Sequence, residues 1–423
     1  MKEDFISYLW KNRLLFPDQL FTTTGEPVQV VHPGQQNSDA GPDFFAARIR
    51  IGGTLWAGNV EIHVRSSQWN QHGHQADAAY DNIILHVVFE HDQEVFNSRG
   101  KVMPVLEIKD CFEHKLLQNY QRLQVSKAWV PCEGLVGETD ALILNNWLNR
   151  LLVERLERKS AEVLHFFKYF GNDWEQTFYF LLARNFGFKV NASPFGLLAQ
   201  RTSHKLLERN RNNLTALEAL LFGQSGLLGE HLQDVYPRSL LAEYRHQQRK
   251  HDLKPIDAKL WKFARLRPVN FPTIRIAQFA MLFHQSGHLF RNMVETKKPS
   301  DIHLQFKVKA SPYWDDHYVF GKSSPKREKH LGKDAINNLV INTVAPVLFI
   351  YGKQSMRPEL CDKALNLLQE TPPENNSVVR KWESLGVNAQ HAADSQALLE
   401  LKKYYCTPKK CLQCPIGHMI LKR

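Results

Sequence analysis

Short stretches of alternating apolar and polar residues dominate the first 110 positions. They predict an amphipathic helix over residues 5–16, followed by strands over 27–34, 43–51, 55–64, 83–91 and 101–108. The Gly-Gly pair at 52–53 predicts a tight turn between the second and third of these strands. A polar loop with one helical turn separates the third strand from the fourth. The order of elements therefore predicts a compact α/β domain that ends near residue 110.

After residue 110 the apolar positions follow the period of an α-helix. Helices are predicted over residues 141–170, 173–188, 273–295 and 334–353, the last apolar enough to be buried. We expect an α+β protein in which a small sheet domain precedes a mainly α-helical body. The expected boundaries give an α/β domain at 1–110, a basic helical domain at 111–355, and C-terminal helices with a cysteine cluster at 356–423. The basic stretch 321–334 is predicted to be a disordered loop.

Charge divides the chain at the same place. The net charge of the 423 residues is +11, but residues 1–110 hold 9 Lys and Arg against 14 Asp and Glu, which gives −5 there and +16 in the remainder. An acidic domain can hold a cation, and a basic body can attract a polyanion. The alternative is that these charges only keep the protein soluble.

The sequence predicts a cytoplasmic protein. No apolar run reaches the ~18 residues of a membrane span, and the acidic, interrupted start does not fit a signal peptide. We therefore expect no membrane partner. In the reducing cytoplasm, the six cysteines are expected to be free, metal-bound or catalytic rather than paired in disulfides.

Two acids flank the predicted hairpin. Asp43 opens one strand, and Glu61 and His63 share a face of the next because residues two apart on a strand point the same way. Two converging carboxylates suit Mg²⁺ or Mn²⁺, which can activate water and neutralise charge on a phosphate. We therefore expect Asp43 and Glu61 to be metal ligands, and both to be catalytic together with His63. The alternative is a solvated sheet face on which Glu61 pairs with Arg65.

Polar residues surround this hairpin. Gln35, Asn37 and Asp39 precede it, and the loop after it contains His72, His74 and Asp77. Six of the 19 histidines lie before residue 110. The set favours a metal site, although each residue alone fits a surface loop.

Pro42-Asp43 and Glu61-Ile62-His63, with the order of elements, resemble the core of the PD-(D/E)XK nuclease superfamily. The resemblance covers about the first 110 residues and implies a restriction-endonuclease-like sheet and metal-dependent hydrolysis of phosphodiester bonds. His63 stands where that superfamily has lysine. A histidine is largely uncharged at neutral pH, so this departure favours either a softer metal such as Mn²⁺ or a loss of catalysis.

Nearly the whole chain resembles a bacterial family known as domain of unknown function 2851. The stretches that carry this likeness are "NSDAGPDFFAARIRIGGTLWAGNVEIHVRSSQW", "AYDNIILHVVFEHD", "FGFKVNASPF" and "DSQALLELKKYYCTPKKCLQCPIG". The resemblance implies one shared architecture and supplies no function.

The tail carries Cys406, Cys411 and Cys414 in a C-x₄-C-x₂-C pattern. Such spacing predicts a metal site, with zinc favoured over an iron–sulphur cluster. Some nucleases of the superfamily hold such a cluster partly with C-terminal cysteines, but their usual spacing, C-x₂-C-x₅-C, differs. Cys361 and His418 are candidates for a fourth ligand, whereas Cys111 and Cys132 are expected to be ordinary buried residues. The alternative is three thiols without a metal.

Two basic stretches follow in the helical body. Residues 262–275 combine Lys262, Arg265, Arg267 and Arg275 with phenylalanines, and a second cluster includes Lys326 and Arg327. Arginine beside aromatic rings suits nucleic acid, which pairs through phosphates and stacks through bases. Exposed helix ends and a solvated loop are the alternative explanation.

These features support three hypotheses. The first is a divalent-metal-dependent nuclease that binds DNA or RNA. The second is a catalytically inactive protein that keeps the nuclease-like fold and binds nucleic acid or acts as a scaffold. The third is a metal-dependent enzyme that acts on a small molecule and has no affinity for polyanions.

Overall fold

The computed structural model describes residues 2–423, which form two compact units. Unit 1 combines the residues up to Asn145 with Leu401–Arg423, and unit 2 comprises Asn146–Glu400. The sequence of unit 2 is therefore inserted between two parts of unit 1. This division differs from the three consecutive segments expected from the sequence, because the last 23 residues fold with the N-terminal part of the chain.

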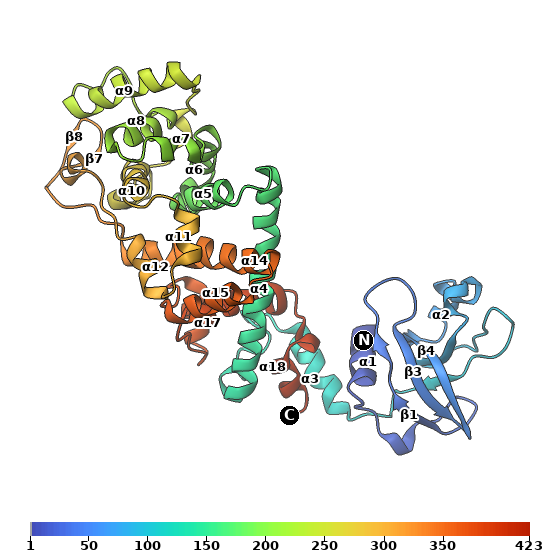
Figure 1. Cartoon of the computed structure of the whole chain (residues 1–423). Helices are drawn as coiled ribbons and strands as arrows, with labels where there is room; N and C mark the ends of the chain where they lie inside the picture. Colours follow the sequence, from blue (N-terminus) through green and yellow to red (C-terminus); the bar gives the residue numbers. More distant parts are fainter. Residues whose placement is uncertain (1) are drawn as a thin grey trace. The chain divides into compact units, whose positions relative to one another are not determined.

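Unit 1 is built on a mixed sheet (Figure 1). Its strands run in the order β1-β3-β4-β5-β6, and β2 pairs with β3. The first pairs, β1–β3 and β3–β4, are antiparallel, whereas β4–β5 and β5–β6 are parallel. Their bounds are β1 (Val28–His32), β2 (Gln35–Gln36), β3 (Phe44–Ile51), β4 (Thr54–Arg65), β5 (Ile83–Glu90) and β6 (Val105–Glu107).

The second half of strand β4 is covered on both faces, whereas residues 54–57 are exposed. Helix α1 (Glu3–Lys11) packs against it, and so does α2 (Gln68–Gln71). Four consecutive residues, 60–63, are buried, so side chains on either face of the strand lie inside the protein. In a strand with one face exposed to solvent, buried and exposed residues would alternate. Glu61 and His63 are therefore interior residues.

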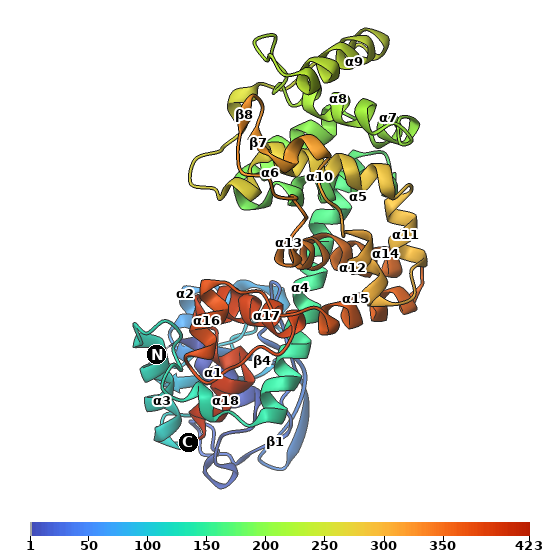
Figure 2. The ribbon, with the colours of Figure 1, turned by 90° about the vertical axis from the view of Figure 1, so that its left-hand side faces the viewer.

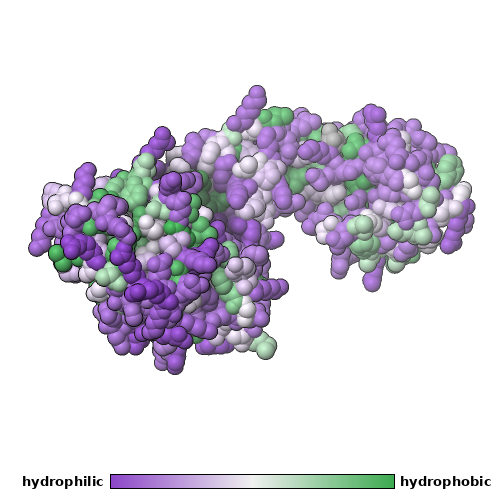
Figure 3. All heavy atoms as spheres, turned by 90° about the horizontal axis from the view of Figure 1, so that it is seen from above, coloured by the Kyte–Doolittle hydropathy of each residue, from purple (hydrophilic) through white to green (hydrophobic). Residues whose placement is uncertain are grey.

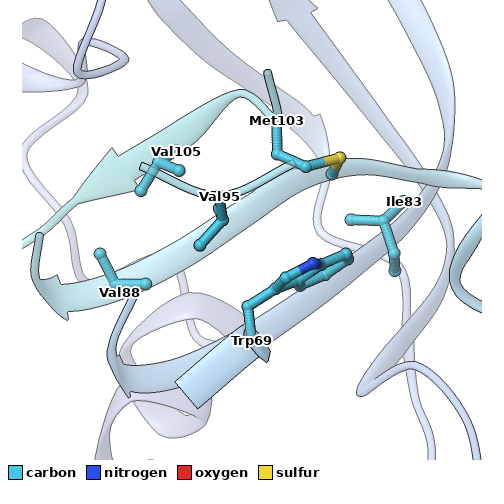
Figure 4. Close-up of a cluster of buried hydrophobic side chains, with 6 residues drawn as sticks. All are labelled: Trp69, Ile83, Val88, Val95, Met103 and Val105. Atoms are coloured by element: carbon cyan, nitrogen blue, oxygen red, sulfur yellow. The ribbon is translucent and has the colours of Figure 1, made fainter. Parts of the chain in front are cut away.

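The connection between the parallel strands β4 and β5 contains only short helices. These are α2, η2 (His74–Ala76) and η3 (Ala78–Tyr80). A buried cluster holds this connection against β5, as Figure 4 shows, with the Trp69 ring lying beside aliphatic side chains from the strands and loops. The members of the cluster are Trp69, Ile83, Val88, Val95, Met103 and Val105.

The C-terminal residues pack against α3 (His114–Val125). The side-chain amide of Asn119 donates to the carbonyl oxygens of Ile420 and Leu421, at 3.3 and 3.1 Å. The remaining elements of unit 1 are η1 (Pro17–Gln19), η4 (Val136–Glu138), the π-helix η9 (Leu401–Cys406), η10 (Cys411–Gln413) and α18 (Pro415–Leu421). Helix α4 (Ala141–Tyr169) runs across the boundary between the two units.

Unit 2 is mainly helical, as the sequence predicts. In Figure 2 α14 lies beside α15, and the two are in extensive contact. The elements are α5 (Trp174–Phe186), α6 (Phe188–Arg201), α7 (His204–Arg209), α8 (Leu214–Gln224), α9 (Val235–His251), η5 (Ala258–Leu260), η6 (Pro268–Asn270), α10 (Pro272–Gln285), α11 (Leu289–Glu295), α12 (Pro299–Gln305), η7 (Pro312–Asp315), β7 (His317–Val319), β8 (Lys322–Ser323), α13 (Lys333–Leu339), η8 (Val340–Val344), α14 (Ala345–Gln354), α15 (Pro358–Glu370), α16 (Ser377–Glu383) and α17 (Ala392–Glu400). The α+β fold class is thus confirmed.

Two local predictions for unit 2 are wrong. The helix expected over 273–295 is divided into α10 and α11, because His288 adopts a left-handed conformation with φ of 53°. The stretch 321–334 is structured: β8 pairs with β7, and Lys329 is buried. The Lys329 ammonium donates to the carbonyl oxygens of Asp315 and Arg327, which compensates for its loss of water.

The segment Lys333–Gln354 is long and apolar enough to cross a membrane, but 78% of its apolar window is buried inside the protein. That setting is typical of a core helix, in agreement with the buried helix expected at 334–353. Hydrophilic residues cover most of the face shown in Figure 3, with smaller apolar areas between them.

Candidate functional site

The two hairpin acids meet at the start of β3. Phe44 pairs with Val60, which places the preceding Asp43 next to Glu61. The Asp43 amide donates to Glu61 Oε2 at 3.2 Å, and the Ile62 amide donates to Asp43 Oδ2 at 2.9 Å. The structure therefore brings together the two acids that the sequence singles out.

A β-bulge shapes β3 beside these acids. The register shifts between Phe44 and Ala47, and Ala46 has a positive φ of 54°. The Ala46 amide donates to Asn59 Oδ1 at 3.3 Å instead of pairing with the backbone of β4. Bulges bend a strand and redirect its side chains, and they occur often next to active sites. This one separates the Asp43 end of β3 from the regular hairpin.

His63 lies at the centre of a group of histidines. It is buried, and its Nδ1 lies 2.9 Å from His86 Nε2 on β5. Its Nε2 lies 3.0 Å from His72 Nδ1 in the loop after β4. A hydrogen bond to one ring nitrogen fixes the orientation of the other, so His86 directs His63 Nε2 towards the loop.

His74 completes the group and joins it to the carboxylates. Its Nε2 lies 3.3 Å from Glu61 Oε1, and His63 Nε2 lies 3.7 Å from the same oxygen. The His74 Nε2 atom is buried and makes no hydrogen bond. One ligating atom from each of His63, His72 and His74 lies within 4.8 Å of the others. We call His63, His72, His74 and His86, together with Asp43 and Glu61, the histidine–carboxylate cluster.

Aromatic rings hold the loop histidines in place. The Tyr80 ring stacks on the ring of His74, with 3.8 Å between the ring centroids. The centroid of the Trp69 ring lies 5.4 Å from that of His74 and 5.3 Å from that of His86 on β5. Trp69 belongs to the hydrophobic cluster of Figure 4. The apolar core thereby positions the polar site.

Burial perturbs the protonation of the cluster. It raises the pKa of Asp43 to about 6, and burial together with the charge of Asp43 raises the pKa of Glu61 to about 8. Burial and the neighbouring histidines lower the pKa of His63 to about 2 and that of His86 to about 3. A neutral imidazole is the form that binds metals, and a cation would stabilise the two carboxylates.

The spacing of these groups fits a single ion. Ligands at 2.0–2.1 Å from a tetrahedral ion lie about 3.4 Å from one another. Three of the separations between candidate ligand atoms, 3.0, 3.3 and 3.7 Å, lie around that value, and the separations among the three histidines stay within 4.8 Å. Imidazoles suit transition metals such as Zn²⁺ and Fe²⁺, whereas Mg²⁺ prefers oxygen ligands. The mixed donor set thus fits a transition metal better than Mg²⁺.

The solvent-exposed alternative for Glu61 is wrong. Arg65 lies near Glu90, with Nε 3.5 Å from Oε2, whereas Glu61 is buried. Asp77 caps η3 through the Ala79 amide and so has a structural role. The residue that the sequence prediction missed is His86, whose one signal was a polar side chain within the buried run of β5.

Residues before the site order the loop that leads into it. The Asn37 side-chain amide donates to the carbonyl oxygens of Asp39, at 3.0 Å, and Pro42, at 3.1 Å. Gln35 lies on β2, where it pairs with Phe45. These contacts fix the backbone immediately before Asp43, so the expected contribution of this loop is positional.

The tail cysteines gather with a cysteine from the N-terminal part of unit 1. Cys406, Cys411 and Cys414 line one small cavity together with Cys132. Burial, reinforced by the neighbouring thiols, raises the pKa of Cys132 to about 12 and that of Cys411 to about 11. Cys132 is therefore not the ordinary buried residue expected from the sequence.

The two other candidates for a fourth ligand point elsewhere. Cys361 lies on α15 in unit 2, and its thiol faces the Phe349 carbonyl at 3.3 Å. His418 Nε2 lies 2.5 Å from the Leu412 carbonyl, and its ring packs beside Tyr8. Cys111 is buried, with Sγ near the Gln19 carbonyl, as expected for a structural cysteine.

The predicted nucleic-acid-binding residues divide by exposure. Five are exposed: Lys262, Arg265, Arg267, Lys326 and Arg327. Arg275 is buried, and its guanidinium donates to Asn270 and Gln278 and lies over the Phe188 ring. Arg275 is therefore engaged inside unit 2 and is removed from the predicted binding surface.

Comparison with known proteins identifies a family but no activity. No curated protein and no solved structure matches the chain. A family model described as "Protein of unknown function (DUF2851)" matches residues 3–377. The chain belongs to this family.

Proposed function

We propose that the protein is a divalent-metal-dependent nuclease that hydrolyses phosphodiester bonds in DNA or RNA. The observation that carries the proposal is the convergence of Asp43 and Glu61 with three histidines whose ligating atoms lie within 4.8 Å of one another. The residues present fit a transition metal, and Mn²⁺ is the ion we expect to support activity best.

Each residue of the cluster has a proposed task. Glu61, His63 and His74 would hold the ion, and the exposed His72 would be a further protein ligand. His86 keeps the His63 ring in the ligating orientation. When bound, a divalent ion lowers the pKa of a coordinated water and stabilises charge on the phosphate. Asp43 is placed to bind the ion or to accept the proton of the attacking water.

The choice of a phosphodiester substrate rests on two supporting observations. Asp43 directly before β3 and Glu61 on β4 are the two acids for which the PD-(D/E)XK resemblance suggests a phosphodiester substrate. Unit 2 carries exposed basic residues, which suit a polyanion. A small-molecule substrate would not require them.

One observation favours the second candidate, an inactive protein that binds nucleic acid or acts as a scaffold. Where the superfamily that the site resembles has a lysine, this chain has His63, whose lowered pKa keeps it neutral. A neutral ring cannot supply the positive charge that a lysine gives to the transition state. If this second function is correct, the histidine–carboxylate cluster binds a structural metal or no metal.

The two candidate functions predict different results in a nucleic-acid cleavage assay. Full-length protein would be incubated with labelled single- and double-stranded DNA and RNA, with Mn²⁺, Mg²⁺, Zn²⁺ or a chelator. We expect cleavage with Mn²⁺ that Asp43→Asn and Glu61→Gln reduce by a factor of about 100 or more. Glu90→Gln, a more exposed acid on the adjacent strand, is the matched control and should cleave like the wild type.

The outcomes are distinct. Cleavage that survives in both the Asp43 and the Glu61 variants would remove the proposed mechanism. Salt-dependent binding without cleavage under any metal would support the inactive candidate. Metal binding without any affinity for nucleic acid would support an enzyme that acts on a small molecule.

A further inference from the structure

We propose that Cys132, Cys406, Cys411 and Cys414 bind one metal centre through four thiolate ligands. The first of these cysteines follows α3, and the other three lie in the C-terminal tail. The site is separate in residues and chemistry from the histidine–carboxylate cluster. Its test is therefore independent of the proposed nuclease activity.

The first observation is geometric. The four cysteines line the same cavity, of about 20 Å³, and Pro131 and Gly417 contribute to its wall. A Cβ atom on Gly417 would lie 2.0 Å from the Cys411 carbonyl oxygen, so only glycine allows α18 to pack this closely over the thiol-bearing turn. The tail is thus folded tightly around the cavity.

The second observation concerns how the backbone presents the thiols. The Leu135 and Val136 amides both donate to the Cys132 carbonyl, at 2.9 and 3.0 Å, which forms a turn. The Cys414 amide donates to the Cys411 carbonyl at 3.3 Å, closing the C-x₂-C turn. A C-x₂-C turn places two thiolates on one ion or cluster.

The third observation is that this packing joins distant parts of the chain. Gln124 at the end of α3 donates to the Lys409 carbonyl at 3.1 Å, and the Lys409 ammonium donates to the Gln124 carbonyl. These contacts hold the end of α3, from which the chain leads to Cys132, beside the tail. A metal bound there would fasten the two segments of unit 1 that flank the inserted unit 2.

The chemistry of the four gathered thiols, of which Cys411 and Cys414 are buried, favours a cation. Without a metal these thiols stay protonated, and a soft metal takes them as thiolate ligands and displaces their protons. Both a structural zinc ion and an iron–sulphur cluster use four cysteines.

The spacing of the thiols points to the larger occupant. Thiolates on one zinc ion at about 2.3 Å lie about 3.8 Å apart. Among residues 2–423, the histidines are the group whose ligating atoms lie within 4.8 Å of one another, and the thiols do not form such a group. A cluster of several iron atoms keeps its cysteine ligands further apart than one zinc ion does, so an iron–sulphur cluster would require less movement of the thiols and is the occupant we expect.

The test measures the metal in full-length protein purified without air. We expect iron and inorganic sulphide, with the visible absorbance of an iron–sulphur cluster, and at least about a tenfold loss of both in Cys132→Ser. Cys361→Ser and Cys111→Ser are matched controls and should keep the metal. Stoichiometric zinc that is lost in Cys132→Ser but kept in the controls would support the four-thiolate site with the smaller occupant.

A second measurement does not depend on the folding of a variant. Wild-type protein stripped by a chelator would be titrated with Co²⁺, and four thiolate ligands should give intense thiolate-to-cobalt absorption at one equivalent. The proposal is overturned if anaerobic protein carries neither metal and the stripped protein shows no such absorption. It is equally overturned if Cys132→Ser retains as much metal as Cys361→Ser.

Discussion

Binding of Mn²⁺ to the histidine–carboxylate cluster is predicted to release about one proton per ion at pH 7. Glu61 has a pKa of about 8 because it is buried next to Asp43, so about nine-tenths of it is protonated at pH 7. Asp43, with a pKa of about 6, adds about one-tenth of a proton. His63 is already neutral and releases none.

The direction of the pH dependence follows from these values. An ion binds the carboxylate rather than the carboxylic acid, so affinity should rise by up to about tenfold per pH unit between pH 6 and pH 8. It should level off above pH 9, where Glu61 is ionised in the free protein.

The metal-free protein should show the opposite trend in stability. The folded state holds the Glu61 proton more tightly than the unfolded state, in which the pKa is about 4.5. The stabilisation is complete below that pH and is lost as the pH rises through 8, by up to roughly 4–5 kcal/mol. Saturating Mn²⁺ should remove most of this decline.

Titration calorimetry in two buffers of different ionisation enthalpy measures the protons released at pH 7 and at pH 9. About one proton at pH 7 and about one-tenth at pH 9 are expected. Glu90→Gln should give the wild-type values. An affinity that stays constant from pH 6 to pH 8, with no proton released at pH 7, would refute the assignment of Glu61 as a ligand.

Three further predictions concern positioning, packing and the basic surface. His86→Ala should weaken Mn²⁺ binding about 10- to 100-fold without removing a ligand, as measured by calorimetry; an unchanged affinity would contradict its orienting role. Gly58→Ala should lower the free energy of unfolding by about 1–3 kcal/mol in urea, because its Cβ would lie 2.7 Å from the Asn82 carbonyl oxygen; wild-type stability would contradict that close approach. Neutralising three exposed cations, Lys262, Arg265 and Arg267, should weaken the salt dependence of binding to single-stranded nucleic acid. The slope of the logarithm of the binding constant against the logarithm of the salt concentration should fall by about 2 in magnitude. An unchanged slope would place the binding surface elsewhere.

The sheet and its acids were accessible from the sequence because they depend on local patterns. The hairpin was predicted from the alternation of apolar and polar residues and from the Gly-Gly turn. The two-residue spacing of Glu61 and His63 predicted that their side chains share one face of the strand. The apolar run of β5 showed that it is buried. These signals also placed Asp43 beside Glu61, as the hydrogen bonds from backbone amides to the two carboxylates do in the structure.

The features that could not be predicted from the sequence depend on contacts between residues far apart in the chain. His86 has no local signal beyond its polarity, and its role arises from pairing between β5 and β4. Cys132 meets the tail cysteines only because the chain returns to unit 1 after residue 400. Arg275 was expected on a basic surface and Lys329 lies in the stretch predicted to be disordered, yet backbone and side-chain acceptors inside unit 2 allow both to be buried.

Anomalous diffraction from crystals grown with Mn²⁺ tests the central claim most directly. We predict one strong peak within about 2.0–2.2 Å of a Glu61 carboxylate oxygen and of imidazole nitrogens from His63 and His74. A map in which manganese is absent from these side chains, at concentrations that support cleavage, would contradict the metal centre on which the proposed function depends.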